Sequence, residues 1–477
     1  MARRSLRLHG VDASTFTAGI AAIAAELDIH DDFPPEVLAE ADEVTRMASL
    51  PDEDMTALPL VTIDPPGSRD LDQAVYIERS GTGFTVWYAI ADVATFVRPG
   101  GAVDAEAHRR GQTLYAPDHR IPLHPPAFSE GAASLLPGQL CPALVWRIDL
   151  DAHGDQRQAD VRRVRVRSRA QYDYGQVQRG LDTGEAPEGV RLLRDVGSLR
   201  QERERERGGV SLPLPEQEVV TSDGCWSLTY RAQLPVEEWN AQISLLTGMA
   251  AADMMMYAEV GLLRTLPPAQ PRAVGRLRRT ARALHIAWPE AMSYPMFVAT
   301  LDPAKPTHAA MLEACTRLLR GAGYMAFEGG VPEQPLHAAI AEEYAHATAP
   351  LRRLADRYVG EICVSLCADE PVPEWVRASL RDLPAVMKES DRRAASFDRA
   401  VIDLVEAGVL AGSVGSVFAG VVVDIDDESP REGTVVIAEP AVEASVRADA
   451  ALALGDTVQV RLDAADPAQR TVRFSLA

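Results

Sequence analysis

The last part of the chain, residues 411–477, contains only short strand patterns, and this feature most restricts how the chain can fold. Five runs rich in valine and other β-branched residues alternate with turns that contain Gly, Pro and Asp. Five short strands in so small a segment are typical of a small barrel of the OB type. The sequence therefore predicts an OB-type β-barrel at this end of the chain.

Residues 55–410 combine strand and helix patterns. β-branched and aromatic runs begin at Leu60 and continue to Arg169, with turn residues between them. Helical patterns follow at 236–265, 275–287, 309–322, 351–367 and 374–411, the last with a break near Pro384. The whole pattern predicts an α+β protein in which a mixed α/β domain precedes the barrel.

Residues 1–54 are predicted to form a separate, small helical region. Ile20 and Ile23 recur at helical spacing behind a cap candidate at residues 14–15, and Pro35 opens a second helix. Two short helices in succession suggest a helix-turn-helix-like unit.

The chain is acidic, with 48 basic and 69 acidic side chains and a net charge of −21. A field of that sign opposes non-specific binding of nucleic acids, although a local basic groove stays possible. All basic residues except Lys305 and Lys388 are arginines, so contacts to phosphate must come from Arg. The barrel region itself holds 11 acidic and 5 basic residues, a net charge of −6.

Composition also excludes several classes of protein. No apolar run has the length of a membrane span, and no apolar segment follows the basic N-terminus. The five cysteines form no CxxC pair, which favours reduced thiols. The phosphate-binding Walker and GxGxxG loops are missing from the sequence. We therefore expect a cytoplasmic monomer that uses no nucleotide cofactor.

The strongest candidate for chemistry is TIDPPGSRDLDQA, residues 62–74. Asp64 ends a predicted strand, and after a turn Asp70 and Asp72 stand two residues apart, so that they point the same way in an extended segment. Three carboxylates in this arrangement suit Mg²⁺ or Mn²⁺, and a pair of such ions can activate water for phosphodiester cleavage. Because DxD also occurs elsewhere, for example at residues 52–54, a solvated loop remains the alternative.

The second candidate is YAHATAPLRRLADRYVGE, residues 344–361. Thr348 is predicted to cap a helix, which would set Arg352 and Arg353 near its N-terminus, where free N–H groups attract phosphate. The alternative is an ion pair between Arg352 and Asp356 on a solvated helix face.

The third candidate is LYAPDHRIPLHPP, residues 114–126. Here Tyr115 heads a proline-rich stretch that also contains His119, Arg120 and His124. An exposed tyrosine in such a loop could stack on a base. The alternative is that it packs against the prolines.

Taken in order, these three segments resemble the RNase II/RNase R family of exoribonucleases. The resemblance runs from about Leu60 to about Leu410, and residues 412–477 resemble the C-terminal RNA-binding OB domain of that family. It implies an RNB-type catalytic domain whose deep channel admits only single strands. It further implies hydrolysis of single-stranded RNA from the 3′ end, with Mg²⁺ and release of nucleoside 5′-monophosphates.

The resemblance also implies roles for individual residues. Asp64, Asp70 and Asp72 match the metal-binding aspartates of the family, and Asp72 matches the one on which cleavage depends most. Tyr115 matches a tyrosine that stacks near the 3′ end of the RNA.

Two further segments of the resemblance concern contacts to RNA. Arg352 matches an arginine that contacts the scissile phosphate, and Arg353 matches its basic neighbour. In SDRRAASFDRAV, residues 390–401, Asp398 takes the place of an acid near the 3′ nucleotide and is one methylene shorter than the usual Glu. The implied catalytic set is thus Asp70, Asp72 and Arg352.

The chain departs from the family in three respects. Gln73 stands where a fourth aspartate is usual; its amide oxygen could ligate a metal but brings no charge, so Gln73→Asp is expected to strengthen metal binding. The 54 residues ahead of the catalytic motif are too few for two cold-shock domains. The barrel is acidic, which weakens its expected contribution to RNA affinity.

Three functions are compatible with these patterns. The first is a processive 3′→5′ exoribonuclease, and the retention of Asp64, Asp70, Asp72 and Arg352 favours it. The second is an RNA clamp with weak catalysis, which Gln73 and the acidic termini suggest. The third is a metal-dependent transferase that uses the DxD pair, but it lacks a glycine-rich loop for phosphate.

Overall fold

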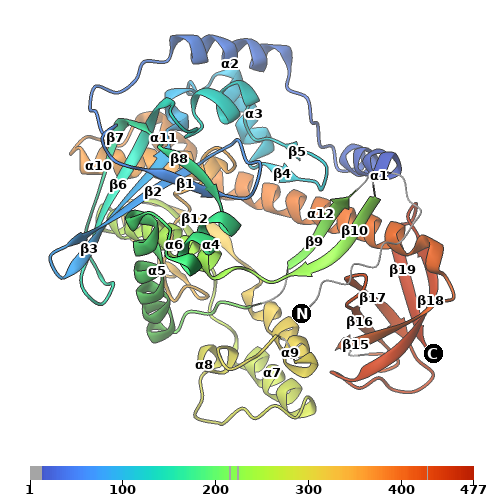
Figure 1. The fold of residues 1–477 in the computed structure, drawn as a ribbon. Coiled ribbons are helices and arrows are strands. Elements are labelled where there is room, and N and C mark those ends of the chain that lie inside the picture. Colours follow the sequence, from blue (N-terminus) through green and yellow to red (C-terminus); the bar gives the residue numbers. More distant parts are fainter. Residues whose placement is uncertain (1–12, 214–215, 223–224, 304, 427) are drawn as a thin grey trace.

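The computed structural model describes residues 13–213, 216–222, 225–303, 305–426 and 428–477. A six-stranded sheet lies at the centre of its larger part (Figure 1). The strands are β1 (Val61–Asp64), β2 (Gln73–Ser80), β3 (Gly83–Ala91), β6 (Leu140–Leu150), β7 (Gln156–Arg167) and β8 (Ala170–Asp173). Their order is β7-β6-β3-β2-β1-β8, antiparallel except for the parallel pair β1 and β8. The predicted strands between Leu60 and Arg169 are confirmed.

Helices cover both faces of this sheet. Because neighbouring side chains on a strand point to opposite faces, Val75 and Ile77 join one apolar core, whereas Ala74 joins another. The first core is covered by α4 (Tyr174–Thr183), α5 (Glu188–Arg207), α6 (Pro235–Tyr257), α10 (Leu354–Cys367) and α11 (Glu374–Leu380), and the second by α2 (Pro35–Met47) and α3 (Ala102–Arg110). The region where β1 and β2 meet is thus supported by packed helices on both faces of the sheet.

The C-terminal segment forms the closed five-stranded barrel that its pattern predicts. Its strands are β15 (Val417–Ile425), β16 (Glu432–Ile437), β17 (Val442–Arg447), β18 (Thr457–Asp466) and β19 (Thr471–Leu476), in the order β15-β16-β17-β19-β18. The long helix α12 (Leu383–Leu410) runs from the sheet layer to this barrel (Figure 1). Apolar side chains of α12 share one core with the barrel, so the two parts are packed together rather than merely linked.

The N-terminal helices differ from the predicted helix-turn-helix-like unit. Helix α1 (Ala13–Glu26) packs through Phe16 and Ile20 on α12, whereas α2 packs through Val37 on the second core of the sheet. The two helices therefore bury their apolar faces on different parts of the molecule (Figure 1). Residues 14–15 lie inside α1, so they are not its cap.

Three further helices form a unit beside the barrel. They are α7 (Pro271–Ala283), α8 (Tyr294–Val298) and α9 (Pro306–Thr316), and their shared core includes Val423 of β15. Four short strand pairs complete the fold: β4 (Leu114–Tyr115) with β5 (Arg120–Ile121), β9 (Glu216–Ser222) with β10 (Cys225–Arg231), β11 (Val260–Thr265) with β12 (Gly323–Glu328), and β13 (Leu336–His337) with β14 (Glu342–Glu343).

The predicted helix over 236–265 is too long. Helix α6 stops at Tyr257, and Glu259 has a φ of 55°, a left-handed conformation that a helix cannot continue through. The following residues form β11, which buries Leu262 and Leu263 against the first core. The apolar residues at the end of the predicted helix therefore form the strand β11.

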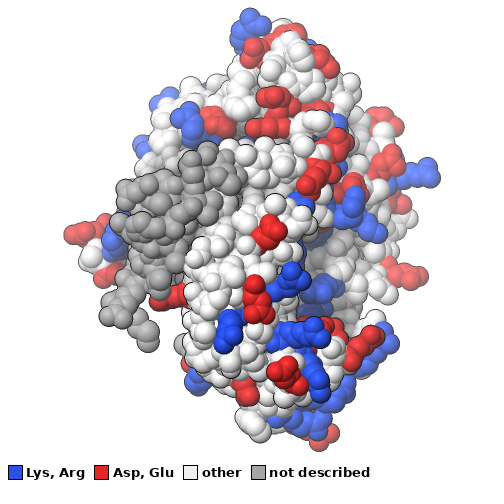
Figure 2. Space-filling model, turned by 90° about the vertical axis from the view of Figure 1, so that its right-hand side faces the viewer, with Lys and Arg blue, Asp and Glu red and all other residues white. Residues whose placement is uncertain are grey.

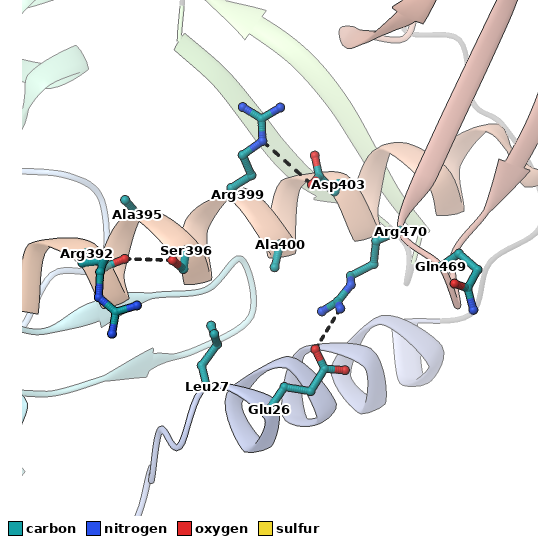
Figure 3. A pocket seen from close by; sticks show the side chains of 10 residues that line it. All are labelled: Glu26, Leu27, Arg392, Ala395, Ser396, Arg399, Ala400, Asp403, Gln469 and Arg470. Atoms are coloured by element: carbon teal, nitrogen blue, oxygen red, sulfur yellow. Dashed lines mark hydrogen bonds and ion pairs between the residues drawn. The ribbon is translucent and has the colours of Figure 1, made fainter. Parts of the chain in front are cut away.

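A groove of about 580 Å³ lies where α1, α12 and the loop between β18 and β19 meet (Figure 3). Arg470 of that loop forms an ion pair with Glu26 of α1 at 2.8 Å, which joins the barrel to the N-terminal helix. None of the site residues predicted from the sequence lines the groove. Among the described residues, no helix has both the length and the apolar character that crossing a bilayer requires.

Candidate active site

The three predicted aspartates gather where β1 ends and β2 begins. Asp64 is the last residue of β1, Asp72 directly precedes β2, and the two strands pair antiparallel at Val61 and Val75. Asp72 is buried, with 2% of its surface exposed, whereas Asp64 and Asp70 are partly exposed. The chain thus turns back on itself to bring the carboxylates together.

The carboxylate oxygens of this cluster are incompletely paired. Oδ1 of Asp72 accepts a hydrogen bond from the Leu351 N–H at 2.8 Å, but its Oδ2 is buried and accepts none. Oδ2 of Asp64 is likewise buried without a donor. The Arg352 Nε lies 3.6 Å from Asp72 Oδ2. Buried anionic oxygens without donors are costly, so the pair fits an added cation.

Burial governs the acidity of these two groups. It raises the pKa of Asp64 to about 6 and that of Asp72 to about 7. The positive charge of Arg352 acts against both shifts, and the negative charge of Asp70 adds to them. The charges of Arg352 and Asp70 thus act on both Asp64 and Asp72, as expected of a single site.

Asp70 has a different partner. Its Oδ1 accepts a hydrogen bond from Arg120 Nη1, and Arg120 also pairs with Glu130 at 2.7 Å. Arg120 belongs to the third sequence candidate, where no role was assigned to it. The loop before β5 places its guanidinium beside Asp70, a contact between positions fifty residues apart that local spacing does not reveal.

Gln73 is not oriented as a metal ligand. Its Oε1 accepts a hydrogen bond from the Tyr88 hydroxyl at 2.5 Å, and its Nε2 donates to the Thr348 carbonyl at 2.7 Å. The amide therefore ties β2 to the loop that carries Arg352. In the described part of the chain, no group of three His, Cys, Asp or Glu side chains is arranged to hold a metal ion. The carboxylates that stay open to a cation are Asp64 and Asp72.

The structure separates the two arginines of the second candidate. Arg353 precedes α10 and donates to Asp356 through Nε at 2.5 Å and Nη2 at 2.8 Å. This pairing rules out the predicted alternative of an Arg352–Asp356 pair. Arg352 keeps 45% of its side chain exposed, near Asp72. Arg352 is thus placed to meet a ligand, whereas Arg353 holds the loop.

The loop before α10 is built differently from the prediction. Helix α10 begins at Leu354, so Thr348 is not its cap; the Thr348 hydroxyl is instead within 2.7 Å of the Ser244 hydroxyl. Asp356 of the first turn accepts the Ala349 N–H at 2.7 Å, in addition to binding Arg353. The loop is therefore fixed by two buried carboxylates, one on the sheet and one on the helix.

Tyr115 lies at the rim of the site. It ends β4, which pairs with β5 through Tyr115 and Arg120, and half of its surface is exposed. The Arg352 charge and those of Asp70 and Asp72 act on its hydroxyl, so the ring lies near these groups. An exposed ring beside a half-exposed arginine is suited to stacking on a base.

Asp398, the acid predicted to lie near the 3′ nucleotide, forms no hydrogen bond or ion pair with the aspartate cluster in the described part of the chain. Burial raises its pKa, and none of the other predicted site residues contacts it. Two turns earlier on α12, Asp391 accepts a hydrogen bond from Arg264 at 2.8 Å. Arg264 also lies over the Tyr324 ring, 4.6 Å from its centroid. Asp391 is therefore an acid of α12 that is tied, through Arg264, to the Tyr324 ring.

Comparison with protein families decides the assignment. The model of the RNB domain matches residues 52–367. The chain belongs to the RNB family. A model of the RNase II-type exonuclease C-terminal S1 domain matches residues 416–477. The RNB domain thus holds the aspartate cluster, and the S1 domain is the barrel.

Relatives of this RNB chain include known ribonucleases. Ribonuclease R of Escherichia coli is 26% identical over 490 residues, which cover 92% of this chain and 59% of the relative. Ribonuclease R of Aquifex aeolicus is 25% identical and is covered to 69%, against 95% of this chain. The chain spans about three fifths of the length of the Escherichia coli relative.

Solved structures share the fold. The apo form of Mycoplasma genitalium RNase R has a TM-score of 0.87 at 20% identity and covers 97% of this chain and 78% of its own. The same enzyme is known in complex with ribose methylated single-stranded RNA. Yeast Ssd1, described as a pseudonuclease, has a TM-score of 0.69 at 15% identity, over 93% of this chain and 57% of its own.

Proposed function

We propose that this RNB chain is a 3′→5′ exoribonuclease that hydrolyses single-stranded RNA processively and releases nucleoside 5′-monophosphates. One observation carries the proposal: two buried carboxylate oxygens, on Asp64 and Asp72, lack donors beside the half-exposed Arg352. A site with unpaired negative charge and one available guanidinium suits a cation and a phosphodiester together. The similarity to ribonuclease R supports the choice of RNA.

The chain's own residues would divide the reaction as follows. Arg352 binds a non-bridging oxygen of the scissile phosphate, and Tyr115 stacks on a base near the 3′ end. Water forms a bond to phosphorus, the P–O3′ bond breaks, and the departing 3′ oxygen takes up a proton. Gln73 and Arg353 act as positioning residues, because they fix the loop that carries Arg352.

We further propose Mg²⁺, with Mn²⁺ as a substitute, as the cofactor. Asp64 and Asp72 are the residues that would hold it, and Asp70 would join them if its carboxylate left Arg120. When bound, the cation supplies charge that stabilises the phosphoryl oxygens and activates water.

The test uses RNA labelled at either end. With Mg²⁺, a 5′-labelled oligoribonucleotide should be converted to a short end product without accumulation of intermediate lengths, and a 3′-labelled one should release labelled mononucleotide from the start. A chelator should stop both. Release of mononucleotide first from the 5′-labelled RNA would contradict the direction, and release of short oligonucleotides would contradict an exonuclease.

The second candidate is an RNA clamp without cleavage. It is favoured by Gln73, which is engaged in hydrogen bonds, and by Asp70, whose charge Arg120 neutralises. The same experiment decides between the two, because a clamp retains the RNA and leaves both labels intact. The fold does not discriminate, since it is shared with a pseudonuclease.

A further inference from the structure

One stretch of this acidic chain is purely basic. Residues 260–289 contain six arginines and no Asp or Glu, although the chain as a whole has a net charge of −21. Most of this stretch forms α7 and its flanks, outside the site described above. A local excess of arginine in an acidic protein marks a surface for an anionic partner.

Three of the five arginines of α7 lie on one side of the helix. At 100° per residue, Arg272, Arg276 and Arg279 fall within a sector of about 60°. The buried Leu277 and Ala281 lie on the opposite side, in the core shared with α8 and α9. Adding Arg282, which lies about 60° beyond this sector, gives four exposed arginines, which we call the α7 stripe. It is about 15 Å long, from the helical rise.

The stripe keeps most of its positive charge available. Among the described residues, Arg279 and Arg282 have no ion pair, and Arg272 donates to the neutral Gln270 at 3.0 Å. Arg278, outside the stripe, differs: it stacks on Trp288, 4.4 Å from its ring, and donates to backbone carbonyls of the following loop. Arg278 thus stabilises the fold, whereas the arginines of the α7 stripe are exposed.

The stripe lies close to the site along the chain. Helix α7 begins seven residues after Arg264, a distance of at most about 25 Å for an extended chain. Arg264 itself pairs with Asp391 and covers Tyr324, whose pKa is raised by burial and is also affected by the charges of Arg353 and Asp356 beside the site. Figure 2, which looks onto the right-hand side of Figure 1, shows basic side chains gathered near the bottom of this face, with acidic ones among them.

The barrel is poorly equipped for the same task. Residues 411–477 have a net charge of −6 and only two aromatic residues, Phe418 and Phe474. Their rings pack edge to face at 6.0 Å, within the barrel core and its margin. Binding of single strands relies on basic grooves and exposed aromatic rings, and neither of the two aromatic rings of the barrel is among its exposed side chains.

We propose that the α7 stripe binds the phosphate backbone of the RNA upstream of the nucleotides in the active site. The inference rests on the proposed function for the identity of the ligand. The stripe would supply the electrostatic grip that an acidic barrel does not, and arginine suits it because its planar fork pairs with phosphate oxygens.

The test is the salt dependence of RNA binding. The full chain and the variant R272Q/R279Q/R282Q are titrated with two RNAs. One has about 25 nucleotides, and the other has about 4, the lower end of single-strand site sizes. Each lost phosphate contact lowers the slope of log K against log salt by about 0.7, so the variant should lose about 2. Its affinity loss should be larger for the long RNA than for the short one.

The matched control is R191Q/R194Q/R205Q, which removes three exposed arginines from α5. It should keep the wild-type slope, and melting curves verify that both variants fold. An unchanged slope for the α7 variant, or an equal loss of slope in the α5 control, would overturn the inference. An unchanged slope would indicate that the stripe binds an acidic protein instead of RNA. If the α7 variant shows the predicted loss of slope relative to the wild type but the wild type cleaves no RNA, the proposed function fails while the inference holds.

Discussion

At the scale of single residues, Asp70 and Asp72 stand two positions apart but have different surroundings. Asp72 is buried with one oxygen unpaired, whereas Asp70 is neutralised by Arg120. The DxD pattern identified the pair, because alternation in an extended segment is a local property. It did not reveal Arg120, because that contact depends on how a distant loop packs.

Changing Asp72 to Asn should abolish cleavage and leave RNA binding nearly intact. The amide keeps the shape and the acceptor for the Leu351 N–H but loses the charge that a cation needs. The variant should also lose the rise in melting temperature that Mg²⁺ causes in the wild type. Melting curves with and without Mg²⁺ test this apart from activity, and an undiminished rise would show that the cation binds elsewhere.

Gln73→Asp should weaken the protein rather than strengthen metal binding, contrary to the expectation from sequence. The Thr348 carbonyl would lose its donor and face a carboxylate, at a cost of about 1–3 kcal/mol in the free energy of unfolding. Chemical denaturation of wild type, Gln73→Asp and the length-matched Gln73→Glu measures this. A lower Mg²⁺ requirement with unchanged stability would restore the ligand interpretation.

At the scale of elements, the strands and helices around the site were predictable and their ends were not. Alternating and helical periods located the central strands and α10. Thr348 looked like a cap, yet the helix begins six residues later, because two buried carboxylates hold the intervening loop. Periodicity reports which face is buried, whereas a loop tied by distant side chains leaves no periodic signal.

The two neighbouring arginines of this loop should respond differently to substitution. Arg352→Ala should lower the single-turnover rate by about 10- to 100-fold, as for a charge-assisted contact of roughly 1.5–3 kcal/mol, with little change in melting. Arg353→Ala leaves the buried Asp356 unpaired and should cost about 3–5 kcal/mol in stability. Quenched-flow cleavage and denaturation of both variants would separate them, and equal stabilities would refute the assignment.

At the scale of the whole molecule, the barrel and the RNB domain share a core along α12. The predicted boundary at residue 410 follows the change of pattern in the sequence, but pattern does not show that the two parts are packed against each other. Removing the barrel would expose apolar residues of α12, including Val409 and Leu410. Point substitutions at this contact are therefore more informative than truncation.

Glu406 makes that contact dependent on pH. It is a buried residue of α12 whose carboxylate accepts hydrogen bonds from Gln217 Nε2 at 2.8 Å and from the Glu443 N–H of β17 at 2.9 Å. Burial raises its pKa from 4.5 to about 7, and the nearby charges of Asp403 and Glu443 add to the shift, while its two hydrogen bonds oppose it. The ionised form is therefore disfavoured in the folded protein.

The sign of the effect follows from linkage. Since the pKa is higher in the folded than in the unfolded chain, the folded state binds more protons, and stability falls as pH rises from about 4.5 to about 7. Glu406→Gln removes this loss and keeps an acceptor oxygen for both donors. The variant should match the wild type near pH 4 and exceed its free energy of unfolding by about 1–3 kcal/mol at pH 8, at about 1.4 kcal/mol per pKa unit.

Denaturation of the two proteins across this pH range measures the difference directly, and other titrating groups cancel because both proteins contain them. Asp403→Asn, also on α12, serves as a control, since it removes a neighbouring charge but leaves the buried carboxylate and should give a smaller gain. A difference between Glu406→Gln and wild type that stays constant with pH would mean that Glu406 is ionised at no cost. The stability of the contact between the barrel and α12 would then not depend on protonation of Glu406.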